Sequence, residues 1–322
     1  MVAPFPRESI HSHCQAVHTT NAVVMVPPID FKFNTETSAD NEFQTSLSLS
    51  DSQVREKALA EFNQMVELLR SHGVTVTVMD YAKSKAETPD AVFPNNWFST
   101  SPSGDIYLFP MACENRRREV RSHALSEALK SSGFKTPTFH EIGNLTSPQA
   151  YLESTGVMIM DHSNSTVYAA LSVRCDRQLL QEYVDLAGFR EVIYFDTKMS
   201  SGSPVYHTNV MMAVGEGFAV ICDEIIEEFE RRRVLTSLQK TKDVISITEE
   251  QMGYFCGNVL QLKNEKGERL IAMSLSAYNA FTLEQKSVLR RHGKLVPIDV
   301  STIETIGGGS VRCMIAENYL PK

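Results

Sequence analysis

The chain has 322 residues and a formal net charge of −8 at pH 7, and 42% of its residues are apolar. This composition is that of an ordinary globular protein with a sizeable core. A net negative charge argues against a nucleic-acid partner, and no apolar run reaches the roughly 20 residues that cross a bilayer, so nucleic-acid-binding and membrane-spanning proteins are excluded. Six cysteines at wide spacing, with no Cys-x-x-Cys pair, favour reduced thiols and a cytoplasmic location.

The first residues differ in character from the rest of the chain. Residues 1–19 contain Pro4, Pro6 and three histidines, and they lack the apolar core of a signal peptide. We therefore expect a flexible tail over residues 1–19 and a single folded domain over residues 20–322.

The predicted elements repeat one order five times: a strand, a turn, a second strand, an amphipathic helix and a short strand. The first unit is divided between the two ends of the chain. A strand is predicted at 22–26, a helix at 54–69 and a closing strand at 74–78. Residues 313–316 are expected to form the missing strand by pairing with 22–26. The apolar face of the helix is formed by Val54, Ala58, Phe62, Met65 and Leu69, which follow the 3.6-residue period.

The other four units follow in chain order. Gly133, Gly188 and Gly293 end their helices, and Thr282 with Gln285 forms a capping-box pattern. The predicted strands and helices are 92–100, 106–109, a helix from Val120 to Leu129, and 136–139; then 156–160, 166–171, a helix over 179–187, and 192–195; then 208–214, 218–222, a helix carrying Ile225, Ile226, Phe229 and Leu235, and 244–247; and finally 259–262, 270–273, a helix after Thr282, and 295–298.

The order of these elements defines an α/β fold. The alternative is an open α/β sheet with a parallel core, in which single strands alternate with helices. A hairpin before each helix argues against that arrangement. The repeat instead predicts a closed ring of five units.

A polar residue stands near the start of the first strand in each unit. These residues are Asp90 with Asn95 and Asn96, Glu153, His207 with Asn209, Asn258, and Cys313. Because equivalent ends of repeated strands meet on the axis of a closed ring, we expect these side chains to line one pocket.

Cys313 is the predicted nucleophile because it follows three successive glycines, 307–309. Glycines allow close backbone approach, and their N–H groups can stabilise a thiolate or an oxyanion. Most buried cysteines are only small apolar side chains, and Cys14, Cys113, Cys175, Cys222 and Cys256 are interpreted in that way. The run lacks the spacing of a dinucleotide or phosphate loop, and no His, Cys or Asp spacing indicates a metal site.

Four phrases of the sequence resemble one known family. They are 90-DAVFPNNWF-98, 152-LESTG-156, 206-YHTN-209 and 307-GGGSVRC-313. Together they are similar to the amidinotransferase, or pentein, superfamily, and most similar to its citrulline-utilisation hydrolases. The resemblance implies a five-bladed α/β propeller of ββαβ units over nearly the whole chain.

The resemblance also implies roles for individual residues. Cys313 matches the family nucleophile, His207 the general acid/base and Glu153 the carboxylate that orients the histidine. Asp90, Asn95 and Asn96 are expected at the substrate, as is Asn209. No metal or organic cofactor is implied, the partner is a small amino acid, and a homodimer is allowed. The predicted ligands of the substrate carboxylate are Arg116, or in its place Arg117 or Arg118, and Arg174.

Two departures from the family pattern affect the choice of substrate and the local geometry. Asn96 and Asn209 stand where deiminases have aspartates that bind a guanidinium. An amide both donates and accepts hydrogen bonds, which suits a neutral ureido group such as that of citrulline. The second departure is Ser154, which stands where relatives usually have glycine.

The expected reaction begins with attack by Cys313, as a thiolate beside protonated His207, on the terminal carbon of the substrate. Citrulline would give ornithine, ammonia and carbon dioxide. Residues 31–44 are expected to form a lid. The alternatives are an arginine deiminase or dihydrolase, an amidinotransferase, a ligand-binding pentein without catalysis, and a structural α/β protein without a ligand.

Overall fold

The computed structural model describes residues 18–80 and 87–322. Residues 1–17 of the predicted tail, including Cys14, lie outside this range. His18 and Thr19, which the prediction placed in the tail, are buried, and the Tyr319 hydroxyl donates a hydrogen bond to the carbonyl oxygen of His18. Within the described ranges, no helix is both long and apolar enough to cross a membrane.

The described residues form five separate three-stranded sheets, not one open sheet. In each, the middle strand pairs antiparallel with one neighbour and parallel with the other. This agrees with the predicted repeat. The sheets are β15 (Ala316–Glu317), β1 (Ala22–Met25) and β2 (Thr75–Val78); β3 (Phe98–Thr100), β4 (Asp105–Leu108) and β5 (Thr138–Glu141); β6 (Ile159–Asp161), β7 (Thr166–Ala170) and β8 (Glu191–Phe195); β9 (Met212–Val214), β10 (Phe218–Ile221) and β11 (Asp243–Ser246); and β12 (Leu260–Lys263), β13 (Arg269–Ser274) and β14 (Lys294–Ile298).

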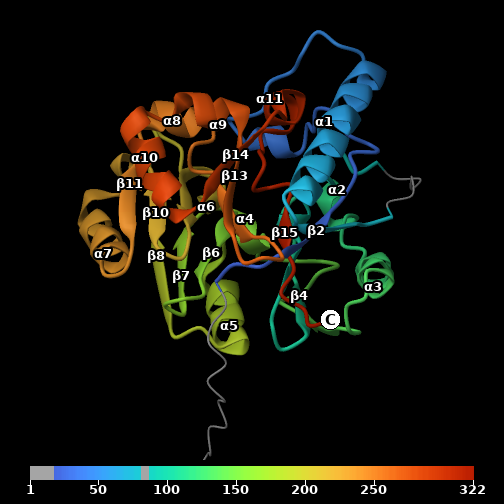
Figure 1. The fold of residues 1–322 in the computed structure, drawn as a ribbon, viewed down its shortest axis with the longest axis horizontal. Coiled ribbons are helices and arrows are strands. Elements are labelled where there is room, and N and C mark those ends of the chain that lie inside the picture. The colour runs from blue at the N-terminus through green and yellow to red at the C-terminus, as the bar shows by residue number, and fades with distance from the viewer. Residues whose placement is uncertain (1–17, 81–86) are drawn as a thin grey trace, which may run out of the picture.

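The longer helices lie around the outside of these sheets (Figure 1). Ser50 and Gln53 form a capping box at the start of α1, and the predicted apolar face of this helix is buried. Thr282 and Gln285 do the same for α10. The helices are α1 (Asp51–Ser71), α2 (Glu114–Arg117), α3 (Ser122–Ser131), α4 (Ser154–Val157), α5 (Arg177–Ala187), α6 (Thr208–Met211), α7 (Glu228–Gln239), α8 (Glu249–Gly253), α9 (Leu275–Ala280), α10 (Leu283–His292) and α11 (Ser301–Gly307), with 3₁₀ turns η1 (Thr37–Ala39), η2 (Pro94–Asn96) and η3 (Asp223–Ile225).

Three predicted first strands begin later than expected, because one helical turn precedes each of them. The predictions 92–100, 156–160 and 208–214 are corrected to β3, β6 and β9, which follow η2, α4 and α6. The side chains of these turns are buried and apolar at several positions, so in the sequence they look like the starts of strands.

The helix of the fourth unit was also predicted with the wrong face. Ile225 lies in η3 and Ile226 is extended, so the helical register restarts at Glu228. Phe229 consequently points outward and is 96% exposed, while Val234 and Leu238 supply the buried face of α7.

The first sheet joins the two ends of the described chain. Val24 pairs with Ala316, and Val23 with Glu317, as the C-terminal strand prediction expected. The strand is shorter than predicted, however. Cys313 lies in the turn before β15, where its N–H donates to the carbonyl oxygen of Ser310 at 2.9 Å.

Candidate active site

Cys313 lies at the floor of a small polar cavity and is only 3% exposed. Its sulfur accepts hydrogen bonds from the amide groups of Asn258, at 3.3 Å, and Asn209, at 3.4 Å. Burial raises the pKa of the thiol, while these two donors and the Ser310 backbone lower it in part. Asn258 is held in turn by Arg312, whose N–H donates to Asn258 Oδ1.

His207 and Glu153 form a buried pair at the N-termini of α6 and α4. His207 Nε2 donates to Glu153 Oε2 at 2.7 Å, and Ala112 N–H donates to Glu153 Oε1 at 3.0 Å. Burial opposes the charge of Glu153, but Arg174, His207 and Arg116 together hold its pKa well below its usual range. Because Glu153 accepts the Nε2 proton, Nδ1 is the free acceptor of a neutral imidazole.

The resting protonation states differ from the expected thiolate and protonated imidazole. Burial lowers the pKa of His207 below its ordinary value, despite the opposing effect of Glu153. Burial raises the pKa of Cys313. Both shifts favour a neutral thiol and a neutral imidazole in the free protein.

The turn that carries Glu153 depends on one left-handed backbone position and on one position where a side chain would not fit. Ser154 has a φ of +40°, a conformation that glycine adopts far more easily, and its hydroxyl donates to the carbonyl oxygen of Phe98 at 3.0 Å. A Cβ atom at Gly156 would lie 2.3 Å from Asn96 Nδ2 and 2.9 Å from His207 Cε1. The turn thus keeps its left-handed residue, and Gly156 leaves room for both site residues.

Arg116 is buried and committed to protein partners. Its Nε and Nη2 donate to Glu119, at 3.0 to 3.3 Å, and its Nη1 donates to Asn96 Oδ1 at 2.9 Å. Burial opposes its charge, but Glu119, Asp90 and Glu153 keep the pKa of Arg116 above its ordinary value. The structure therefore places Arg116 behind Asn96. Arg117 donates to the carbonyl oxygens of residues 111 and 112, and Arg118 pairs with Glu114 at the surface.

Residues 34–44, from the segment expected to be a lid, lie against the cavity, which Thr37 and Asn41 help to line. Asp40 forms a two-pronged ion pair with Arg174, whose Nη1 also lies 3.4 Å from Glu153 Oε2. Asn34 and Thr37 donate to Asp90 Oδ2 at 2.8 and 3.1 Å. The segment therefore contacts both the acidic and the basic residues of the site.

Three buried polar atoms around the cavity have no hydrogen-bond partner among the residues that the structure describes. They are Asp90 Oδ1, Asn96 Nδ2 and Asn209 Oδ1. Buried polar atoms without partners are costly and point to a bound ligand or water. The cavity is narrow, about 10 Å³, and is lined by Thr37, Asn41, Asp90, Phe93, Asn96, Arg116, Arg174, Tyr206, His207, Gly307, Gly308, Gly309 and Cys313.

The structure thus brings most of the predicted site residues together. Some of them line the cavity and others lie behind its lining. Glu153 and Asn209 lie one layer behind the lining, bonded to His207 and Cys313. Asn95 is turned away from the cavity and donates to Thr155 Oγ1 at 3.3 Å.

Residues important to the site were also missed by the sequence analysis. Glu119 and Asp40 neutralise Arg116 and Arg174, and Tyr206 lines the cavity. Asn258 was noted at a strand start, but it was given no role. Only the position of Tyr206 beside His207 could have been a signal, because the two carboxylates come from segments outside the repeat pattern.

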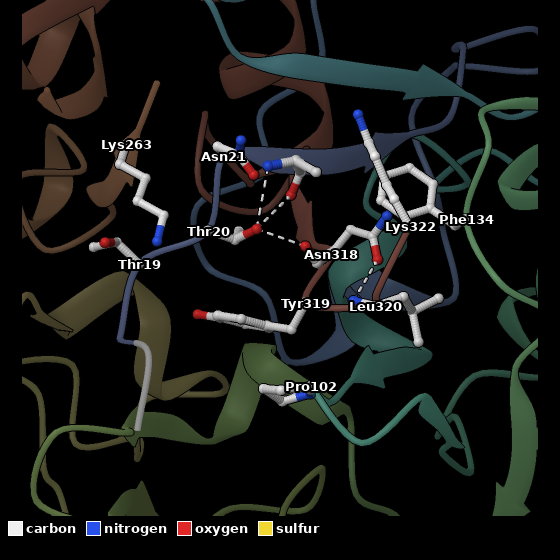
Figure 2. Close-up of a pocket in the computed structure, with 11 residues that line it drawn as sticks. Thr19, Thr20, Asn21, Pro102, Phe134, Lys263, Asn318, Tyr319, Leu320 and Lys322 are labelled. Atoms are coloured by element: carbon white, nitrogen blue, oxygen red, sulfur yellow. Dashed lines mark hydrogen bonds between the residues drawn. The ribbon is translucent and has the colours of Figure 1, made fainter. Parts of the chain in front are cut away.

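A larger cavity has a lining that shares no residue with the small one (Figure 2). It measures about 300 Å³ and is lined in part by Lys263, Lys322 and Tyr319. Figure 2 shows Thr20 joined to Asn318 by a hydrogen bond at one side of it. Among the described residues of its lining there is no cysteine, histidine or carboxylate side chain, whereas the predicted nucleophile Cys313 and its predicted partner His207 line the smaller cavity.

Several solved structures have a fold similar to that of this chain. The N-terminal domain of ArgZ bound covalently to a reaction intermediate has a TM-score of 0.68 at 14% identity, over 92% of this chain and 97% of that chain. The apo form of ArgZ, an arginine dihydrolase from cyanobacteria, has a TM-score of 0.69 at 16% identity, over 93% and 41%. A dimethylarginine dimethylaminohydrolase variant with S-methyl-L-thiocitrulline has a TM-score of 0.64 at 14% identity, over 93% and 100%.

A search among curated proteins gives no match. A family model described as N,N dimethylarginine dimethylhydrolase, eukaryotic, matches residues 27–320. That range includes every residue that lines the smaller cavity, the one that contains Cys313. The chain therefore belongs to this dimethylarginine dimethylhydrolase family, within the pentein superfamily of hydrolases that act on carbon–nitrogen bonds of amidino groups.

Proposed function

We propose that the protein hydrolyses citrulline to ornithine, ammonia and carbon dioxide through a covalent intermediate on Cys313. The observation that carries this choice is the orientation of the Asn96 amide. Arg116 can only donate hydrogen bonds, so the Asn96 atom that it contacts must be the oxygen. Asn96 Nδ2 is then a buried donor without a partner in the protein.

A free donor at this position favours a ureido group over a guanidinium. The ureido carbonyl oxygen accepts a hydrogen bond, whereas a guanidinium has five N–H donors and no acceptor. A guanidinium would leave Asn96 Nδ2 unsatisfied, at a cost of about 1–3 kcal/mol for a buried polar group. Asp90 Oδ1, in the lining of the cavity, is free to accept a ureido N–H group.

The chemical steps follow from the neutral pair in the free protein. His207 Nδ1 takes the Cys313 proton as the sulfur attacks the ureido carbon. The imidazolium returns the proton to the terminal nitrogen, the C–N bond breaks and ammonia leaves a thiocarbamate. Water, deprotonated by His207, then breaks the C–S bond. The resulting carbamate loses carbon dioxide to give the ornithine side-chain amine, and the thiol is restored.

The amino-acid end of the substrate is assigned to Arg174. Arg116 has its N–H groups directed at Glu119, Asn96 and backbone carbonyl oxygens, so it has little capacity for another anion. Arg174 lines the cavity, and its Nη1 has only the longer contact with Glu153. A substrate carboxylate would join or displace Asp40 on this guanidinium.

The test is product analysis with purified protein. Citrulline, arginine and Nω,Nω-dimethylarginine are each incubated with the protein, and ornithine, citrulline, ammonia and dimethylamine are quantified by mass spectrometry. We expect ornithine and ammonia from citrulline, and none with Cys313→Ser, which should keep the thermal transition of the wild type. Binding of citrulline without turnover would instead support a ligand-binding pentein and overturn the proposal.

A second candidate is arginine dihydrolysis, which the carboxylate of Asp90 favours. Asp90 is a buried carboxyl group with a free oxygen. Burial raises its pKa and Arg116 opposes that shift, and a guanidinium would likewise favour its charged form. ArgZ, with a similar fold, is described as an arginine dihydrolase. In the same product analysis, formation of ornithine from arginine would support arginine dihydrolysis. Citrulline as the final product would indicate a deiminase, and dimethylamine would indicate dimethylarginine hydrolysis.

We also propose that the five sheets close into a five-bladed propeller around this site. Support comes from contacts between the first strands of successive sheets: β15 lies against β3, β6 against β9, and β9 against β12. Lys263 N–H at the end of β12 donates to the carbonyl oxygen of Thr20, just before β1.

A further inference from the structure

Tyr206 is the residue that links the histidine side of the site to the glycine run before Cys313. It is 5% exposed and lines the cavity. Its ring centroid lies 4.5 Å from that of His207, with 34° between the two planes. Its hydroxyl donates to the carbonyl oxygen of Gly308 at 2.7 Å. One side chain thus contacts both the acid/base and the loop of the nucleophile.

The Gly308 end of this link is tightly defined. Gly308 has a φ of +61°, and a Cβ atom there would lie 2.6 Å from Asn41 Nδ2 and 2.7 Å from Gln44 Cγ. The run continues into Ser310, whose hydroxyl donates to Glu304 at 2.6 Å and whose carbonyl oxygen accepts the Cys313 N–H. A shift of Gly308 would therefore be passed on to the nucleophile.

The His207 end is equally constrained, because Tyr206 stands between several groups. The guanidinium carbon of Arg174 lies 5.0 Å from the Tyr206 ring centroid, a cation–π distance. Phe43 packs against another side of the ring, with the centroids 6.0 Å apart. The Tyr206 ring thus fills the space beside the His207 imidazole. Glu153 holds that imidazole through a hydrogen bond from Nε2.

We propose that Tyr206 is a positioning residue that fixes the separation between His207 and Cys313. The tilted contact between the two rings sets the plane of the imidazole. The hydrogen bond from the hydroxyl to Gly308 sets the position of residues 307–309. Reacting groups displaced by about 1 Å can lose on the order of 100-fold in rate. This inference rests on the proposed function only in that Cys313 and His207 perform the chemistry, and it does not depend on the choice of substrate.

The two contacts can be separated by two substitutions. Tyr206→Phe keeps the stack and removes the hydrogen bond to Gly308, and Tyr206→Leu removes both. Tyr168→Phe is the matched control, because its hydroxyl also makes one hydrogen bond, with Ser237 at 2.9 Å, and it does not line the cavity. We expect Tyr206→Phe to lower kcat by about 10-fold and Tyr206→Leu by about 100-fold. KM of Tyr206→Phe should stay within about 2-fold of the wild type, because its ring still packs against Arg174.

A substrate-independent measurement keeps the inference separate from the proposed function. Iodoacetamide alkylation of Cys313, followed by peptide mass spectrometry, reports how readily His207 takes the thiol proton. We expect Tyr206→Phe to slow this alkylation and Tyr168→Phe to leave it unchanged. Equal kcat and alkylation rates in Tyr206→Phe and the wild type would overturn the role of Tyr206. A wild type that is alkylated rapidly but turns over no ureido or guanidino compound would overturn only the proposed function.

Discussion

Gly156 shows how closely the side chains of the site are packed. Its missing Cβ leaves the space in which Asn96 Nδ2 and the His207 ring lie. Neither side chain can retreat cheaply, because Asn96 is held by Arg116 and His207 by Glu153. The smallest possible addition at this position must therefore move His207, the proposed acid/base, or Asn96, the proposed contact of the ureido group.

We expect Gly156→Ala to lower kcat/KM by on the order of 100-fold, since displaced reacting groups lose rate steeply. Gly253→Ala is the control, because a Cβ atom at Gly253 meets nothing within 4 Å. Steady-state kinetics and a thermal melt of both variants check this. Near-normal kinetics in Gly156→Ala would show that the site tolerates the displacement.

The pH dependence follows from the buried imidazole. His207 must be neutral to accept the thiol proton, and burial lowers its pKa below the ordinary value of 6.5. The activity should therefore persist as the pH falls through 6.5 and be lost only below the lowered pKa. Glu153 raises the pKa of His207, so Glu153→Gln should move this acid limb further down and also lower the plateau. The profile of kcat/KM against pH measures both effects, and an acid limb above pH 6.5 would contradict them.

At the residue scale, the sequence located the reacting groups better than their surroundings. Cys313, His207 and Glu153 could be grouped because each stands at an equivalent point of the repeat. Asn95 could not be separated from Asn96, since neighbouring residues in a 3₁₀ turn point in different directions. The partners of Arg116 were also out of reach, because an ion pair with Glu119 leaves no signature that distinguishes it from a solvated helix face.

At the scale of elements, periodicity worked where one helix face is buried over several turns. In α1 the predicted apolar face is buried throughout, and the capping residues lie where the helix begins. Periodicity failed at α6, which is a single turn of helix before β9. It also failed at α7, where η3 breaks the helical register before the helix begins. One turn of helix contains too few residues to show a 3.6-residue period.

Two phenylalanines illustrate the difference between a helix face that was predicted correctly and one that was not. Phe62 of α1 is 2% exposed and Phe229 of α7 is 96% exposed. We expect Phe62→Ala to lower the free energy of unfolding by about 3–5 kcal/mol through the cavity it creates. Phe229→Ala should change it by less than about 0.5 kcal/mol. Chemical denaturation of both variants gives the comparison, and similar values would mean that Phe229 is covered in solution.

At the scale of the whole molecule, closure of the first sheet connects the fold to the site. β15 follows Cys313 by three residues and is held by β1 and by the hydrogen bond from Thr100 to the Glu317 carbonyl oxygen. The sequence predicted this pairing from the one unit that lacked a strand. The nucleophile is thus fixed by a strand that it does not belong to.

Removal of residues 316–322 should consequently abolish turnover although Cys313 remains. We expect the melting temperature to fall by on the order of 10 °C, because the sheet loses a strand and its flanking hydrogen bonds. Lys322→Ala serves as the control for a change at the same end. Circular dichroism melts and turnover assays test the pair, and an active shortened chain would show that β15 does not hold the site.

The hydrogen bond from Tyr319 to His18 has a consequence for how the chain can be cut and rejoined. Because residues 18 and 319 already touch, a short linker could join them, and new ends could be opened at the exposed turn of residues 102–104. Such a circular permutant would carry all three strands of the first sheet on one continuous stretch of chain. It should fold and retain activity. The order of the five units along the chain would then not be required for folding or for activity.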